Sequence, residues 1–187
     1  APSLLLALIS DMGGMNLYFH SSGIGHQNPA LDIETELMTV DTNAMGFTRM
    51  VTVAFKFFES HPDQNGHIAV ISSIAGTRGL GASPAYSSTK RYINHYLECL
   101  TQLKNIKGLK RLTISDIRPG FVRTPLLDSD AKYPMQLDVV DVAKEIVAGL
   151  KKKKSIITVD WKYRILVAFW RMIPRFIWVR LKIVSKK

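Results

Sequence analysis

A serine, a tyrosine and a lysine form the most informative pattern of this 187-residue sequence. Ser73 follows a mainly apolar run at residues 68–72, Tyr86 lies thirteen positions further on, and Lys90 comes four positions after Tyr86. Side chains at i and i+4 share one face of a helix, so Lys90 should lie beside the phenol and favour its ionised form. A phenol tuned toward neutral pH can act as a general acid/base while Ser73 holds the substrate oxygen. The trio therefore predicts proton transfer at an alcohol oxygen, with a bound cofactor carrying the hydride.

Two further motifs accompany the trio. Asn43 precedes Ser73 by thirty residues, and Pro-Gly-Phe-Val-Arg-Thr at 119–124 follows Lys90. In this order the motifs resemble those of the short-chain dehydrogenase/reductase family, in which Asn, Ser, Tyr and Lys precede a Pro-Gly-x-Val-x-Thr segment. The resemblance implies that Tyr86 is the proton donor and acceptor and that Ser73 positions the carbonyl or hydroxyl. It also implies that Lys90 binds the nicotinamide ribose and lowers the Tyr86 pKa, with Asn43 anchoring a water relay behind Lys90.

The same resemblance implies a nicotinamide cofactor, NAD or NADP, with NADP slightly favoured. Tyr86 and Lys90 would contact it, together with residues of the segment after the next strand: Pro119, Gly120, Val122 and Thr124. Where the family has Asn-Asn-Ala-Gly after its fourth strand, this chain has His-Ser-Ser-Gly at 20–23. Gly23 permits close approach of the backbone to a ribose. Ser21 and Ser22 are candidate cofactor contacts, although two serines that cap a strand end are an equal alternative.

The N-terminal part departs from the family pattern. The family begins with a strand, a Gly-rich turn and a helix whose N-terminus receives the cofactor pyrophosphate. The early glycine clusters, at 13–14 and 23–25, do not follow the first strand of a βαβ unit with the required third glycine. Residues 15–23 instead resemble the fourth strand of the family. We therefore interpret the chain as lacking the first three strand–helix units, and we expect weak or absent cofactor affinity for the isolated chain.

Short apolar runs, typical of buried strands, alternate along the sequence with longer segments typical of helices. They predict helices at 3–12, 33–59, 84–105 and 139–150, and strands at 15–20, 68–72, 111–117 and 156–159. Short buried strands between long helices indicate an α/β, Rossmann-like doubly wound parallel sheet, here its C-terminal portion of about four strands. The candidate residues would then follow the carboxyl ends of strands, where such sheets bind ligands. We assign residues 1–160 to this partial catalytic domain.

Cysteine and histidine usage gives weaker information. The single cysteine, Cys99, excludes an internal disulfide and suits a reducing compartment such as the cytoplasm, and we expect it to be buried on the helix after Tyr86. The five histidines lack metal-ligand spacing, so the sequence predicts no metal site. His20 and His26 flank the predicted cofactor cleft and are candidates for ligand contact.

Positive charge is concentrated in the last fifth of the chain. Residues 151–187 contain twelve Lys or Arg and one acid, a net +11, whereas residues 1–150 contain thirteen bases and fourteen acids, a net −1. Aromatic residues lie between these cations, and at about 100° per residue one helical face collects Arg164, Arg171, Arg175 and Lys182. We therefore predict a basic, amphipathic C-terminal helix at 161–187, bent at Pro174.

Three partners are open for this C-terminal segment. An anionic membrane surface is favoured, packing onto the rest of the fold or onto a twin subunit comes second, and nucleic acid is the least favoured. The longest uninterrupted apolar run, at 165–170, has six residues, whereas a membrane-spanning helix needs about 20. The segment is therefore expected to lie on a membrane rather than to cross it.

Three functions of different classes follow. The leading one is an NAD(P)-dependent oxidoreductase that interconverts a secondary alcohol and a ketone, on a hydrophobic or lipid-like substrate if the tail reaches a membrane. It would be a cytoplasmic homo-oligomer, or peripheral on the inner face of a membrane. The second is a truncated, non-catalytic module of the same fold, acting through self-association at its exposed first strand or through membrane-surface binding. The third is a basic membrane- or nucleic-acid-binding protein that uses the fold as a scaffold.

Overall fold

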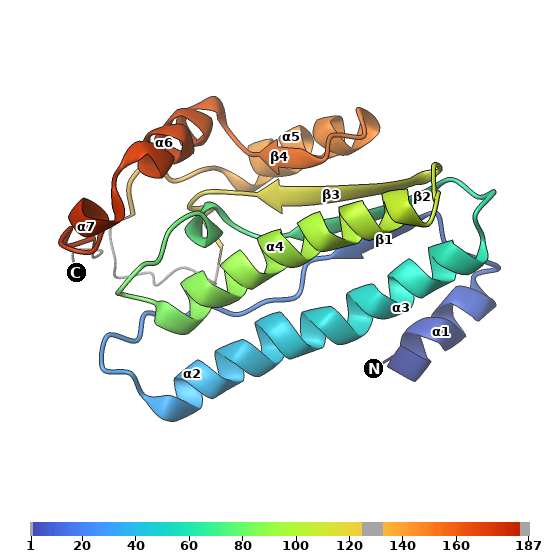
Figure 1. Cartoon of the computed structure of the whole chain (residues 1–187), viewed down its shortest axis with the longest axis horizontal. Coiled ribbons are helices and arrows are strands. Elements are labelled where there is room, and N and C mark those ends of the chain that lie inside the picture. Colours follow the sequence, from blue (N-terminus) through green and yellow to red (C-terminus); the bar gives the residue numbers. More distant parts are fainter. Residues whose placement is uncertain (1, 125–132, 184–187) are drawn as a thin grey trace.

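The computed structural model describes residues 2–124 and 133–183, and within them the centre of the fold is a parallel sheet. Its four strands, in the order β1-β2-β3-β4, are β1 (Leu17–His20), β2 (Gly66–Ile71), β3 (Leu112–Arg118) and β4 (Ile156–Thr158). Every neighbouring pair is parallel (Figure 1). The predicted α/β class, with about four parallel strands, is confirmed.

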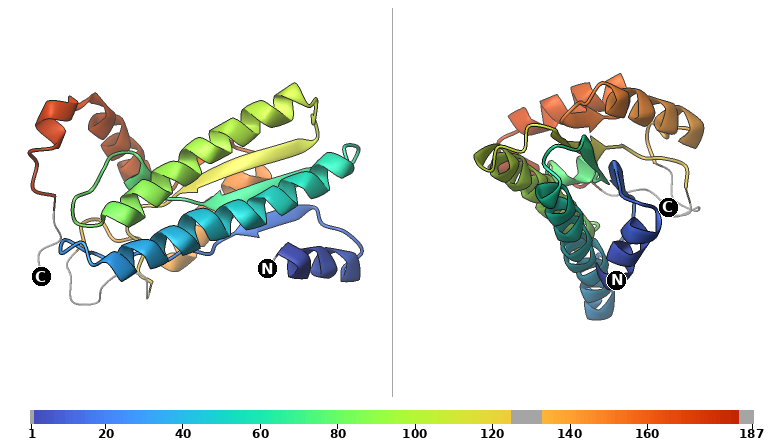
Figure 2. Two further views of the ribbon diagram at one scale, coloured as in Figure 1. Left: turned by 60° about the horizontal axis from the view of Figure 1, so that its bottom comes forward. Right: turned by 90° about the vertical axis from the view of Figure 1, so that its right-hand side faces the viewer.

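Helices cover both faces of the sheet. One face carries α1 (Pro2–Asp11), α3 (Phe47–Ser60) and α4 (Pro84–Ile106), and the other carries α5 (Val139–Lys151), as two further views also show (Figure 2). Helix α3 continues a run that begins with α2 (Ile33–Val40) and passes through a wider π-helical turn, η1 (Asp41–Gly46). A short 3-10 turn, η2 (Ile74–Gly76), links β2 toward α4.

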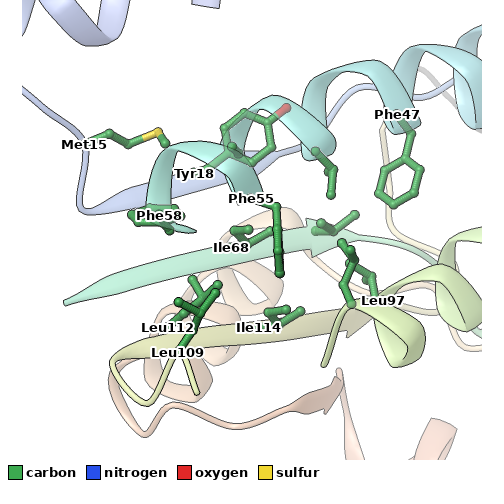
Figure 3. Close-up of a cluster of buried hydrophobic side chains, with 14 of the residues drawn as sticks. Met15, Tyr18, Phe47, Phe55, Phe58, Ile68, Leu97, Leu109, Leu112 and Ile114 are labelled. Carbon is green, nitrogen blue, oxygen red and sulfur yellow. The ribbon is translucent and has the colours of Figure 1, made fainter. Parts of the chain in front are cut away.

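The hydrophobic core is divided by the sheet, because successive strand residues point to opposite faces. Ile68 and Ile114 face α3 and α4, and they pack with Phe55, Phe58 and Leu97 in the larger cluster (Figure 3). On the other face Ala69, Ile117 and Ile157 pack against α5. These two apolar layers hold the strands in the register that brings their carboxyl ends together.

Local signals in the sequence explain where the helices begin. The Asp32 carboxylate accepts a hydrogen bond of 2.9 Å from the Thr35 N–H, which caps α2. Pro84 lies in the first turn of α4, where a missing N–H costs nothing, and Asp138 caps α5. The helix predicted at 33–59 is therefore present, but the π-helical turn η1 interrupts it, which the sequence pattern did not indicate.

The C-terminal segment differs from the single helix that we expected. Helix α6 (Trp161–Met172) ends before Pro174, and α7 (Arg175–Trp178) begins after it. The bend predicted at Pro174 is therefore a complete break, since proline lacks the N–H that would continue the helix. Arg175 and Lys182 lie outside α6, so the prediction that four cations share one helical face is wrong beyond residue 172. The division at residue 160 into two domains stays a prediction.

Two other features of the described residues bear on the predictions. Cys99 is exposed, so its predicted burial is wrong. The buried positions of α4 include Ile93, Leu97 and Leu100, and a residue two positions after Leu97 points about 200° away from it.

In the portion of the chain that the structure describes, no helix is long and apolar enough to cross a membrane.

Candidate functional site

The loop that follows β1 approaches the predicted catalytic residues through two glycines. A Cβ atom at Gly23 would lie 3.3 Å from Asn43 Oδ1 and 3.4 Å from Lys90 Nζ. A Cβ atom at Gly25 would lie 2.7 Å from the ring of Tyr86, closer than such contacts occur. The loop therefore passes close to Lys90 and Tyr86, and at Gly25 only a residue without a side chain permits this approach.

Asn43 holds that loop in place. It lies in the π-helical turn η1 and is 1% exposed. Its Oδ1 accepts a hydrogen bond of 2.8 Å from the Ile24 N–H, and its Nδ2 donates to the Ile24 carbonyl at 2.7 Å and to Thr89 Oγ1 at 3.2 Å. The amide thus ties the loop after β1 to α4. The water relay predicted for Asn43 stays a prediction.

Ser73 and Tyr86 come together across the end of β2 and the start of α4. Ser73 is buried, and its Oγ accepts a hydrogen bond of 3.0 Å from the Ala75 N–H, which caps the η2 turn. Burial raises the pKa of the Tyr86 phenol above its ordinary value, and a hydrogen bond with the Ser73 side chain acts in the opposite direction. The phenol and the hydroxyl therefore share one small environment at the carboxyl end of the sheet.

Lys90 lies beside Tyr86 but contacts its ring rather than its oxygen. The ammonium is 5.6 Å from the centre of the Tyr86 ring and donates a hydrogen bond of 3.2 Å to the Ile71 carbonyl. Burial lowers the pKa of Lys90 to about 8, with the Asp116 charge opposing the decrease. The net pKa of Tyr86 is raised because burial of the phenol dominates, so the lowering expected from Lys90 stays a prediction.

A buried polar network behind Lys90 was missed by the sequence analysis. Asn94 Nδ2 donates to Ser72 Oγ at 2.8 Å and to Asp116 Oδ2 at 3.0 Å, and Ser72 Oγ donates to Asp116 Oδ1. Arg118 completes it with a hydrogen bond of 2.6 Å from Nη2 to Asp116 Oδ2. Two signals could have located it: an acid within a strand predicted to be buried, and Asn94 four positions after Lys90 on the same helical face.

The Pro-Gly segment after β3 joins the same edge of the sheet. The Pro119 carbonyl accepts a hydrogen bond of 3.1 Å from the Ile74 N–H, which links the segment to the turn that follows Ser73. Gly120 packs on the ring of Tyr163, where an added Cβ atom would lie 2.1 Å away. Val122 forms a bridge to Leu137. This segment therefore lies between the catalytic end of the sheet and α6.

The remaining candidates divide between surface and interior. Four candidates are exposed: Ser21, Ser22, His26 and Thr124. Thr124 Oγ1 donates a hydrogen bond to the Val122 carbonyl at 3.4 Å. His20 is buried, and its Nδ1 is 2.8 Å from Tyr18 Oη. In the ranges 2–124 and 133–183, the structure shows no group of three or more His, Cys, Asp or Glu that could hold a metal ion.

The geometry thus unites the residues that the sequence singled out. Four of them lie close together where β1 and β2 end: Asn43, Ser73, Tyr86 and Lys90. Their buried hydrogen-bond donors and the Tyr86 phenol surround one small region. Lys90 uses one of its three N–H donors on Ile71, which leaves donors for the hydroxyl groups of a ribose. Gly23 also permits close approach of a ligand to the backbone, and together with it these donors fit the ribose of a nicotinamide nucleotide.

Comparison of the sequence with known proteins points to the same family as its motifs. The sequence matches the short chain dehydrogenase family over residues 3–133. An uncharacterized oxidoreductase of Myxococcus xanthus is 23% identical over 171 residues, which cover 90% of this chain and 66% of the relative. Dehydrogenase/reductase SDR family member 7B of Danio rerio is 27% identical over 166 residues, covering 80% of this chain and 52% of the relative. The chain therefore spans about half to two thirds of the length of these curated relatives.

Solved structures show the same fold. A short chain dehydrogenase from Burkholderia cenocepacia in complex with NADP superposes with a TM-score of 0.81 at 16% identity, over 98% of this chain and 76% of that one. A short chain dehydrogenase/reductase from Burkholderia phymatum in complex with NAD has a TM-score of 0.74 at 19% identity, over 89% and 69%. The chain belongs to the short-chain dehydrogenase/reductase family, as its motif order predicted.

Proposed function

We propose that this chain carries the catalytic half of an NAD(P)-dependent oxidoreductase that interconverts a secondary alcohol and a ketone. The observation that carries the proposal is the convergence of Ser73, Tyr86 and Lys90 at the carboxyl end of the sheet. Some structural neighbours were solved in complex with NADP and one in complex with NAD, which supports a nicotinamide cofactor. NADP remains slightly favoured. A bound cofactor of this kind supplies or accepts a hydride at the substrate carbon.

Tyr86 is the proposed proton donor in ketone reduction and the acceptor in alcohol oxidation. Its raised pKa keeps the phenol protonated at neutral pH, so it begins the reduction as a competent acid. As the proton leaves, negative charge develops on the phenol oxygen. The buried ammonium of Lys90, mostly protonated at pH 7 because its pKa is about 8, then stabilises that charge.

Ser73 and Asn43 are proposed to position rather than to transfer protons. The Ser73 hydroxyl can donate a hydrogen bond to the substrate oxygen, since its Oγ already accepts from the Ala75 N–H. Asn43 fixes the loop over Tyr86 and Lys90 through Ile24. Gly23, Ser21 and Ser22 on that loop would hold the ribose side of the cofactor, and residues 119–124 its nicotinamide side.

The test compares two tyrosines on the same helix. In a longer protein that supplies the missing strand–helix units, Tyr86→Phe should lower turnover of a ketone panel with NADPH or NADH by about 100-fold to 10,000-fold, the usual contribution of a general acid. The matched control is Tyr92→Phe, because the Tyr92 hydroxyl bonds Thr48 at 2.7 Å near the surface of the same helix. Equal turnover in Tyr86→Phe and Tyr92→Phe would sink the proposed mechanism. Cofactor binding, followed by nicotinamide fluorescence, should persist in both variants.

A second candidate function is a non-catalytic module that associates through its sheet edge. Strand β1 is an edge of the described sheet, and Leu17 and Phe19 on it are 48% and 41% exposed. An uncovered apolar edge favours pairing with another strand. If this interpretation holds, the wild-type chain self-associates, and Phe19→Lys lowers the sedimentation coefficient of that species. A wild-type chain that is both monomeric and active contradicts it. Formation of a homo-oligomer stays a prediction.

A further inference from the structure

Helix α6 packs against the rest of the fold through one face. Tyr163 and Val167 are buried there beside Ile74, and Leu166 and Trp170 pack partly against them. The Tyr163 hydroxyl receives a hydrogen bond of 3.1 Å from the Phe121 N–H and lies 3.0 Å from the Met135 carbonyl. The expectation that the tail packs onto its own fold therefore applies to this face of the helix.

The opposite face of α6 is also apolar, and it is exposed. Trp161, Ile165, Phe169 and Met172 are 62%, 61%, 64% and 78% exposed. At about 100° per residue they fall on one line, centred opposite Tyr163. A helix that buries one face in its own protein normally presents polar residues on the other. We call these four residues the outer stripe.

Cations border the outer stripe on both sides. On the helix, Lys162 lies on one side of it, with Arg164 and Arg171 on the other, and the charge continues with Arg175, Arg180 and Lys182. The sequence from 161 to 183 contains these six bases and no acid. Among the residues that the structure describes, Arg164 is the one of these six paired with an acid, since its Nη2 lies 2.5 Å from Glu145 Oε1.

After the break at Pro174, the chain folds back onto the body through Trp178. The Trp178 indole donates a hydrogen bond of 2.8 Å to the Gly79 carbonyl, and the Arg78 guanidinium lies 5.5 Å from the centre of the Trp178 ring. On either side of Trp178 in the sequence, Phe176 and Val179 are 64% and 65% exposed. Exposed apolar side chains therefore occur in and next to α7 as well as on the outer stripe of α6.

We propose that the outer stripe and α7 form a docking surface for an anionic lipid bilayer. Large apolar and aromatic side chains along one line, bordered by Lys and Arg, match a helix that lies at the boundary between headgroups and acyl chains. The surrounding cations would attract acidic headgroups. A second copy of this chain fits less well, because a symmetric contact would bring the same six bases against each other. Nucleic acid would meet apolar side chains where it needs cations.

The position of this surface gives the docking a consequence. Helix α6 packs on Phe121 and Ile74, which follow the ends of β3 and β2, so it lies at the catalytic end of the sheet (Figure 1). This arrangement would place the substrate opening beside the bilayer and favour an apolar alcohol or ketone dissolved in the membrane. This consequence for the substrate rests on the proposed function. Lipid docking itself does not depend on that activity, and it is measured without it.

The experiment is flotation of the full 187-residue chain with vesicles of phosphatidylcholine alone or mixed with phosphatidylserine. The chain should float with the mixed vesicles, and binding should fall as salt rises. Ile165→Gln/Phe169→Gln should weaken binding by about tenfold or more, since both side chains are exposed and their loss leaves the core intact. Lys162→Gln/Arg171→Gln should weaken it by about fivefold per charge.

A matched control removes equal apolar surface elsewhere. Leu4 and Ile106 are 63% and 75% exposed on α1 and α4, so Leu4→Gln/Ile106→Gln should float like the wild type. Circular dichroism checks that every variant stays folded. Failure of the wild type to float with acidic vesicles, or equal loss in the control, overturns the proposal. So does a stripe variant that only converts a dimer to a monomer, or retention by duplex DNA in place of lipid.

Discussion

His20 should make the stability of this protein sensitive to acid. The side chain is 5% exposed, its Nδ1 is 2.8 Å from Tyr18 Oη, and its Nε2 has no hydrogen-bond partner among the described residues. Burial, together with the charge of Lys90, lowers the pKa of His20 to about 4. Protonation would place a second N–H and a full charge next to that ammonium, inside the core.

The magnitude follows from the gap between the folded and ordinary pKa values, about 4 against 6.5. One pKa unit corresponds to about 1.4 kcal/mol, so His20 contributes about 3 kcal/mol of stability. The unfolded chain binds the extra proton between pH 6.5 and 4, and the folded chain does not. The contribution is therefore complete above pH 6.5 and is lost as the pH falls toward 4.

Urea unfolding at several pH values between 4 and 7 measures this effect. His20→Gln should lose about 3 kcal/mol less than the wild type over that range. His67→Gln is the matched comparison, because burial and Lys153 also lower the His67 pKa, and it should change the pH dependence in the same direction. Identical pH dependence in His20→Gln and the wild type would refute the reasoning, since the buried imidazole would then titrate equally in both states.

Two substitutions test other contacts. In a longer protein that supplies the missing strand–helix units, Gly25→Ala should lower kcat by about 100-fold, because its Cβ atom would lie 2.7 Å from the Tyr86 ring and displace it, whereas Gly81→Ala, with open space around it, should leave kcat unchanged. Equal kcat values in these two alanine variants would exclude the contact. Tyr163→Phe should lower the urea-unfolding free energy by about 1–3 kcal/mol, since the buried Phe121 N–H loses its acceptor. An unchanged unfolding midpoint would show that water replaces that hydroxyl.

The sequence predicted those parts of the site that depend on element periodicity. Tyr86 and Lys90 share a face because α4 is a regular helix, and Ser73 and Pro119 meet because parallel strands end at one edge. Two distant segments that each follow a strand could therefore be placed together before any coordinates. The order of the motifs then identified the family.

The remainder depended on packing that no periodicity encodes. The pKa of Tyr86 is raised because the phenol is buried, and the i, i+4 spacing of Tyr86 and Lys90 carries no information on that burial. The network around Asp116 required knowing which polar residues of β3 and α4 face each other. The sequence left open what lies against the apolar side chains of the C-terminal segment, because an apolar helix face gives the same pattern whether protein or solvent lies against it.

The π-helical turn that contains Asn43 is wound more widely than an α-helix, since its hydrogen bonds join residues five apart instead of four. Six residues, Asp41–Gly46, adopt the wider winding, and α3 continues directly from them with Phe47 and Val51 fully buried. The wider turn accommodates about one extra residue between α2 and α3, so deleting one residue there would return the run to α-helical winding and keep the two helices in phase. Such a deletion would move the Asn43 side chain, and with it the contact to Ile24, while the packing of the two helices is preserved.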